Sequence, residues 1–174
     1  DRATGAGGET LEEAVYEGFL PGGVAVMVEV LTDNKLRSQQ SVREILDKGG
    51  GSMVGAGAVS YMFEQEGEIR IESEGLGEED ELKIIDLNID DVVKDDGEWI
   101  VYCHKEKTFE LKEVLEKMGY KASGVELVMR PTTKVEVQDE NVKNKIEKLV
   151  EQLEDLGDVH NVWINGIAQR RDIR

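Results

Sequence analysis

The stretch Tyr16–Gly23, with the sequence YEGFLPGG, leads directly into the apolar run Val24–Leu31. Pro21, Gly22 and Gly23 predict a turn, because proline presets φ and glycine accepts positive φ. The run that follows is apolar at nearly every position, which is typical of a central strand buried on both faces.

A helix and a second strand follow this run. Asp33 or Asn34 can cap the helix, which ends at Lys48. The glycine tract Gly49–Gly57 comes next, and Val59–Phe63 is expected to be a short strand. This order predicts a β-α-β unit with two polar or glycine-rich loops, and loops on a rigid scaffold commonly carry function.

From Gly67 the hydrophobic pattern starts afresh. Alternating residues predict strands, apolar residues at helical spacing predict helices, and Asp96-Gly97 is a hairpin signal. The expected elements are strands at 68–72, 92–93, 98–103 and 125–129 and helices at 78–87 and 108–119. The order β-α-β-β-α-β over this length predicts a ferredoxin-like unit.

The C-terminal segment is expected to complete the opening unit. It predicts a strand at 134–137, a helix from Asp139 to Gly157 and a strand at 159–164, which have no core of their own. The fold class is therefore expected to be α+β, with two ferredoxin-like β-α-β-β-α-β domains, one inserted into the other. The expected boundaries are a linker at 1–9, a discontinuous domain at 10–64 plus 131–168, an inserted domain at 66–130 and a tail at 169–174.

Charge separates the inserted domain from the rest. The formal net charge is −17, and residues 64–98 alone contain 15 acidic and three basic residues. Nucleic-acid affinity comes largely from Lys and Arg, so most of this surface is unsuited to contact nucleic acid directly. The acidity keeps the protein soluble, and the acidic domain is a possible contact surface for a protein partner.

Residues for catalysis or metal binding are sparse. Cys103 is the single cysteine, so no intrachain disulfide or CxxC site can form, which fits a reducing compartment. His104 and His160 lie in different predicted domains, whereas zinc needs three or four converging ligands. No run approaches the length of a membrane span. We expect a cytoplasmic, monomeric protein that is not an enzyme, with no cofactor, no metal and no membrane association.

The candidate partner-binding residues lie in and beside three loops. They are Tyr16, Glu17, Pro21, Gly22, Gly23, Asp33, Asn34, Lys35, Arg37, Gly50, Gly51, Gly55 and Gly57. The glycine tract follows a helix and so faces its negative end, which argues against a phosphate cradle, but glycine still lets a partner backbone approach closely. We expect the strand-to-helix junction at Asp33 to lie beside the Pro21 turn, so that the three loops form one docking surface.

Several blocks resemble the YebC/PmpR family of regulatory proteins. Tyr16–Gly23 is similar to its Y-E-G-Y/F-G-P-G-G signature, and Thr32–Ser38 (TDNKLRS) is similar to its S/T-D-N-R/K-N-R-T/S segment. Gly55–Phe63 is similar to its G-x-x-G-S-V-x-x-x-F block, and Pro131–Thr133 and Asp158–Asn165 fit later blocks. The resemblance covers about residues 5–167, and Leu20 and Leu36 depart from it, standing where the family has glycine and asparagine.

The resemblance implies a function and a third domain. It implies a cytoplasmic bacterial regulator, or an organellar relative such as the mitochondrial translational activator of cytochrome c oxidase. Family members are described as DNA-binding transcriptional regulators, and some act at the ribosome on stalling sequences. The implied fold also has an N-terminal helical domain with a basic G-H-S-K-W opening, and this sequence lacks that domain. Binding to DNA, RNA or the ribosome is expected to need it. A small-molecule sensor, with a ligand between paired sheets, is the remaining alternative.

Overall fold

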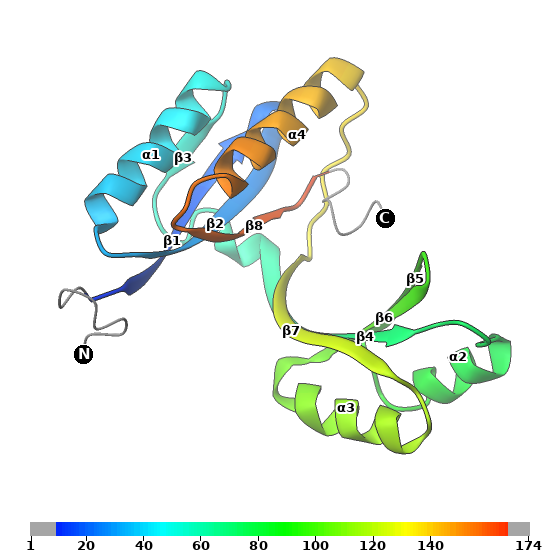
Figure 1. Ribbon diagram of the computed structural model, residues 1–174. Helices are drawn as coiled ribbons and strands as arrows, with labels where there is room; N and C mark the ends of the chain where they lie inside the picture. Colours follow the sequence, from blue (N-terminus) through cyan, green and yellow to red (C-terminus); the bar gives the residue numbers. More distant parts are fainter. Residues whose placement is uncertain (1–9, 167–174) are drawn as a thin grey trace. The chain divides into compact units, whose positions relative to one another are not determined.

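The computed structural model describes residues 10–166 (Figure 1). The predicted α+β class is confirmed: the described chain forms two four-stranded sheets and four α-helices. It divides into two compact units. Unit 1 contains the described residues up to Glu64 and from Pro131 onward, and unit 2 contains Gln65–Arg130.

Unit 1 carries α1 and α4 against one sheet with the strand order β3-β1-β2-β8. Its elements are β1 (Glu12–Leu20), the 3-10 turn η2 (Pro21–Gly23), β2 (Val24–Thr32), α1 (Lys35–Lys48), β3 (Ser52–Val54), the 3-10 turn η3 (Ser60–Met62), α4 (Glu140–Glu154) and β8 (Val159–Ile164). Neighbouring strands of this sheet are antiparallel.

The segment before Pro21 is a strand, which corrects the expectation that Val24–Leu31 is the first strand. β1 and β2 form a hairpin whose register pairs Leu20 with Val24 and Glu12 with Thr32. Gly22 and Gly23 turn the chain with φ of 83° and 76°, as the Pro-Gly-Gly sequence predicts. The alternation of Ala14, Tyr16 and Leu20 toward the core makes this segment a strand.

Two further predicted strands are wrong. Residues 134–137 are not a strand, and β1 rather than this segment lies between β3 and β2 in the sheet. Residues 59–63 contain η3 and only the first residue of the next strand, β4 (Phe63–Glu72). The backbone N–H groups of Val59 and Ser60 donate to the Glu17 side chain, so they are not available for strand pairing. Instead Ser52–Val54, inside the glycine tract, pairs with β1.

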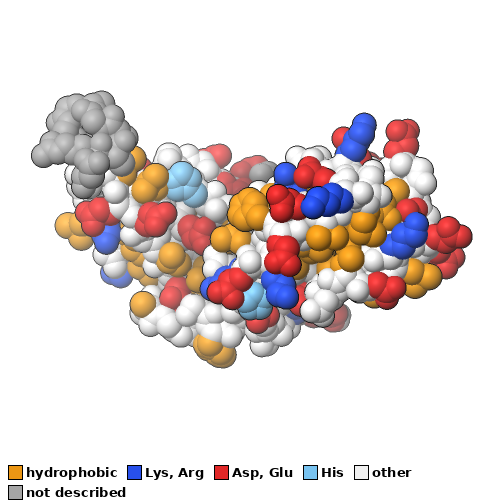
Figure 2. Space-filling view, turned by 90° about the horizontal axis from the view of Figure 1, so that it is seen from below, with side chains coloured by type: hydrophobic (Ala, Val, Ile, Leu, Met, Phe, Trp, Pro, Cys, Tyr) orange, Lys and Arg blue, Asp and Glu red, His pale blue; other side chains and the backbone are white. Residues whose placement is uncertain are grey.

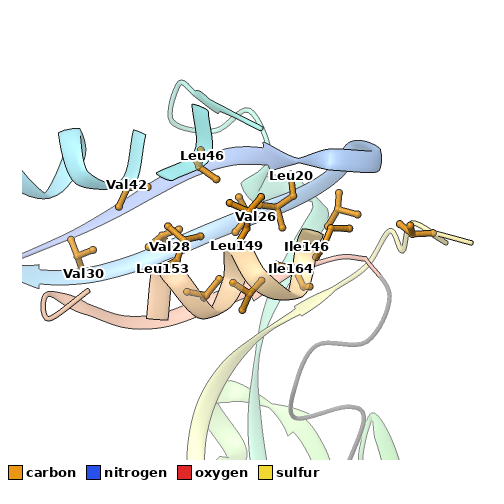
Figure 3. Packing of buried hydrophobic residues seen from close by; sticks show 14 residues of the cluster. Leu20, Val26, Val28, Val30, Val42, Leu46, Ile146, Leu149, Leu153 and Ile164 are labelled. Carbon is orange, nitrogen blue, oxygen red and sulfur yellow. The ribbon is translucent and has the colours of Figure 1, made fainter. Parts of the chain in front are cut away.

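The core of unit 1 lies between the sheet and its two helices (Figure 3). β2 presents Val26, Val28 and Val30 at alternate positions, in agreement with a period of two. α1 and α4 present apolar side chains at i, i+3 or i+4 spacing toward them. The helix side chains that close this core are Val42, Leu46, Ile146, Leu149, Val150 and Leu153.

Unit 2 has the ferredoxin-like order β5-β6-β4-β7 in its sheet. Its elements are β4 (Phe63–Glu72), α2 (Glu78–Ile85), β5 (Asp91–Asp95), β6 (Glu98–His104), the 3-10 turn η4 (Lys105–Lys107), α3 (Thr108–Lys117) and β7 (Ala122–Pro131). The predicted helices and strands are confirmed here to within a few residues. Gly97 turns the β5–β6 hairpin at φ 77°, and Asn88 has φ 61° after α2.

Candidate functional site

The Asp158 carboxylate of unit 1 forms hydrogen bonds with polar side chains at and just before the start of α1. Asp158, in the loop before β8, lies with Oδ2 2.9 Å from Thr32 Oγ1, 2.9 Å from an Arg37 guanidinium nitrogen and 2.7 Å from Ser38 Oγ. The same Arg37 nitrogen donates to Asp33 Oδ1 at 2.7 Å. These five residues are called the Asp158 cluster.

Local capping fixes the backbone around the Asp158 cluster. Asn34 is the N-cap of α1, and its Oδ1 accepts a hydrogen bond from Arg37 N at 3.0 Å. The Tyr16 hydroxyl donates to the carbonyl of Lys35 at 2.9 Å, which ties β1 to the first turn of the helix. Asp158 O accepts from Leu31 N at 2.9 Å, so the loop before β8 is held against the end of β2.

The electrostatics of the cluster favour the ionised carboxylate. The hydrogen bonds from Ser38 and Arg37 hold the pKa of Asp158 below its usual value, and they outweigh its desolvation. The Arg37 side chain is 51% exposed, so Asp33 and Asp158 orient a guanidinium that still faces solvent. Next to it is a pocket of about 210 Å³ lined by Arg37, Ser38 and Asp158, smaller than most small-molecule sites.

A second carboxylate organises the glycine tract. Glu17 is buried, and its two oxygens accept hydrogen bonds from Gly57 N at 2.8 Å, Val59 N at 2.9 Å and Ser60 N at 2.9 Å. Successive amides that converge on a carboxylate form an anion-binding concavity, and here the anion is part of the chain itself. The loop is therefore held in place by β1, and both Glu17 oxygens accept hydrogen bonds from amides of the chain itself.

The predicted single docking surface is wrong in its geometry. The Pro21–Gly23 turn and the Asp33–Arg37 segment lie at opposite ends of β2, because β1 and β2 form a hairpin. Nine residues of strand separate them by roughly 30 Å at ~3.3 Å each. Gly50 and Gly51 lie beside the Pro21 end: a Cβ on Gly50 would lie 3.7 Å from Pro21 Cγ.

The remaining predicted residues fall into different roles. Tyr16, Asn34 and Lys35 support the first turn of α1, while Asp33 and Arg37 belong to the Asp158 cluster. Gly55 and Gly57 have no heavy atoms within 4 Å of an added Cβ, so they face open space. A role of any of these residues in binding stays a prediction.

Sequence reasoning missed three members of the Asp158 cluster. Thr32, Ser38 and Asp158 come from segments up to 126 residues apart, and no local pattern brings them together. One signal was present: Ser38 occupies a buried position of α1, where a polar side chain needs a partner.

Charges on the visible surface are mixed. Figure 2 shows acidic and basic side chains interspersed on this face, with no broad basic area. Any contact with a polyanion must therefore be local rather than spread over the face. Among residues 10–166, no helix is both long enough and apolar enough to cross a bilayer.

Comparison with known proteins places the chain among regulators. Residues 11–166 match the model of the TACO1/YebC second and third domain. A probable transcriptional regulatory protein of Caldanaerobacter subterraneus, TTE1135, is 40% identical over 167 residues, which is 94% of this chain and 68% of the relative. Another protein of that name, from Pseudomonas putida, is 42% identical over 95% of this chain and 68% of its own length. The chain thus spans about two thirds of these curated relatives.

A solved structure agrees with this assignment. The crystal structure of the conserved hypothetical protein Aq1575 from Aquifex aeolicus superimposes with a TM-score of 0.85 at 37% identity, covering 96% of this chain and 69% of that one. The relatives' names support a regulatory role and describe no catalysis. The chain belongs to the TACO1/YebC family, and residues 11–166 correspond to its second and third domains.

Proposed function

We propose that this chain belongs to a non-enzymatic regulator of gene expression that acts by contacting nucleic acid, in the manner of a DNA-binding transcriptional regulator. The observation that carries the proposal is the family match over residues 11–166, together with relatives named probable transcriptional regulatory proteins. A regulator of this kind works in the cytoplasm. A ribosome-associated role in translation is the alternative, since the family model also bears the name TACO1.

The side chains of the chain support regulation by binding rather than by catalysis. Cys103, the single thiol, is buried, and burial raises its pKa, so it is held as a protonated thiol. The Asp158 cluster pairs its hydroxyl and carboxylate groups with one another. These groups hold the exposed Arg37 side chain in place. A guanidinium oriented in this way is well suited to contact a phosphate.

The acidic charge sets where a nucleic acid can lie. Residues 64–98, mostly in unit 2, carry most of the excess acid, and a phosphate backbone is repelled there. We infer that unit 1 meets the nucleic acid and that unit 2 faces solvent or a protein partner. The protein acts as a monomer in this scheme.

Binding of the full-length protein to duplex DNA, to single-stranded RNA and to ribosomes tests the proposal. Fluorescence anisotropy measures the first two and sedimentation through a sucrose cushion measures the third, each over a series of salt concentrations. We expect saturable, salt-sensitive binding to one of the three, and the preferred target decides between transcription and translation. Failure to bind all three at low salt contradicts the proposal.

A further inference from the structure

A groove on unit 1 lies where the end of α1 meets the middle of α4. Its volume is about 510 Å³, and its lining includes the side chains of Lys48, Lys145 and Lys148 over an apolar floor of Ile45 and Leu149. We call it the lysine groove. Neither the motifs nor the Asp158 cluster include any of these lysines.

Close packing of the two helices creates the groove. A Cβ on Gly49 would clash with the Leu149 side chain, so the glycine lets α4 approach the end of α1. Gly50 then turns the chain away with φ of 89°. Lys145 and Lys148 are three residues apart and so lie on the same side of α4, and they line the same groove as Lys48.

The three lysines, with one glutamate in the lining, give the groove a net positive charge. Within residues 10–166 none of them forms an ion pair, although other lysines of the chain pair with glutamates. All three are exposed, and Glu44 is the one carboxylate in the lining. In a chain with a net charge of −17, this is a local concentration of positive charge.

The lysines, rather than the backbone, are the groups that can hold an anion here. The amides of Gly49, Gly50 and Gly51 all donate to carbonyls in the last turn of α1, so they are not available. A lysine ammonium is a flexible point charge that suits phosphate, whereas planar bidentate recognition of carboxylates favours arginine, which the groove lacks.

We propose that the lysine groove binds the phosphate backbone of a nucleic acid. The inference rests on the proposed function and adds to it the surface that makes the contact. Lysine–phosphate contacts position a nucleic acid without reading its bases. Sequence or structure selectivity, where the protein has it, therefore comes from other residues.

The test compares two triple variants in the full-length protein. In the first, Lys48, Lys145 and Lys148 become glutamine, which removes their charge and keeps much of their length. The matched control makes the same change at three exposed lysines of unit 2 that form no ion pair in the described chain: Lys105, Lys117 and Lys121. A third variant replaces the groove lysines with arginine and keeps the charge. Thermal melting verifies that all three variants are folded.

The measurement is the affinity for labelled single-stranded RNA and duplex DNA across a salt series. Each lost phosphate contact lowers the slope of log K against log salt by about 0.7 for a single strand, so the groove variant loses about 2 in slope. The same relation predicts a loss in affinity on the order of 50-fold near 0.15 M salt. The unit 2 control and the arginine variant are expected to stay within a few-fold of the unmodified protein.

Each outcome has a separate meaning. If the groove variant binds as tightly as the unmodified protein and its salt slope is unchanged, the inference is wrong, while the proposed function stands with another contact surface. Equal losses in the groove variant and the unit 2 control also overturn it, since net charge then explains the effect. If the unmodified protein binds no nucleic acid and no ribosomes, the proposed function fails and the inference fails with it. If the groove instead binds an acidic segment of a protein, the groove variant keeps its affinity for nucleic acid and its salt slope, and the inference is wrong.

Discussion

Replacing Glu17 by glutamine tests whether a buried carboxylate holds the glycine tract in place. One Glu17 oxygen accepts from Val59 N and Ser60 N, and the other accepts from Gly57 N. Glutamine has nearly the same shape, so packing is preserved. The glutamine oxygen can still accept from Val59 N and Ser60 N, but without a negative charge. Its NH2 group then faces Gly57 N, so that two donors meet and no hydrogen bond forms.

The size of the effect follows from these three bonds. A hydrogen bond to a charged group contributes about 1.5–3 kcal/mol, and a neutral one contributes about 1 kcal/mol. Losing one charged bond and weakening two predicts a loss of about 2–3 kcal/mol, because solvent near Gly57 offsets part of the cost. For a chain of this size the melting temperature falls by roughly 5–10 °C.

Hydrogen exchange gives the local readout that melting alone lacks. Exchange of the Val59 and Ser60 amides, followed by NMR, should accelerate strongly in the Glu17→Gln variant. The control is Glu13→Gln, a change at an exposed glutamate on the same strand. If Glu17→Gln leaves both the melting temperature and these exchange rates at the unmodified values, the carboxylate does not hold the loop.

Three further changes probe unit 1 and unit 2 separately. Asp158→Asn should lower the stability of unit 1 at neutral pH. Ser38 and Arg37 hold the pKa of Asp158 low, so the ionised carboxylate stabilises the fold until the pH falls through that folded-state pKa. The unmodified protein should therefore lose stability on acidification, and the variant should lack this part of the loss. Glu66 should titrate near 7 by ¹³C NMR, because burial and a hydrogen bond with a neighbouring aspartate raise its pKa from 4.5 to about 7. Stability should therefore fall as the pH rises across that interval, and Glu66→Gln should remove the fall. Gly49→Ala should cost about 1–3 kcal/mol in urea unfolding, because its methyl group enters space that an α4 side chain fills.

Each of these predictions has a result that contradicts it. A pH profile of unfolding that is identical for Asp158→Asn and the unmodified chain removes the carboxylate from the account. A Glu66 titration near 4.5 contradicts the prediction and means that the ion pair with Arg130 outweighs burial. For Gly49→Ala the matched control is Gly55→Ala, which faces open space, so equal stability of the two variants contradicts the packing argument.

The features that the sequence predicted correctly depend on nearby residues. Asn34 caps α1 and Gly97 turns the β5–β6 hairpin, because each conformation is determined within a few residues. Unit 2 could be predicted for the same reason: its hydrophobic periods and turn signals follow one another without interruption. The α+β class depends only on those local patterns.

The features that the sequence did not predict depend on distant partners. The alternation in β1 is compatible with a strand, but its place between β3 and β2 follows only from its pairing with both of them. Glu17 was predicted only as a partner-binding residue, and its hydrogen bonds with amides 40 to 43 residues away were not foreseen. Asp158 reaches Ser38 across 120 residues. Periodicity contains no information about which distant side chain meets which.

The insertion of unit 2 depends on one feature of its topology. β4 and β7 are neighbours in the sheet of unit 2, so the segment that enters the unit and the segment that leaves it lie together. The backbone of unit 1 shows the same closeness, since Thr132 N donates to Met62 O at 2.8 Å. The two ends of the chain that flank the insertion therefore lie close together within unit 1, as they would across a short turn, and closing the chain there adds little entropy cost. This explains how η3 and the extended segment after β7 can belong to one unit although 69 residues separate Met62 from Thr132.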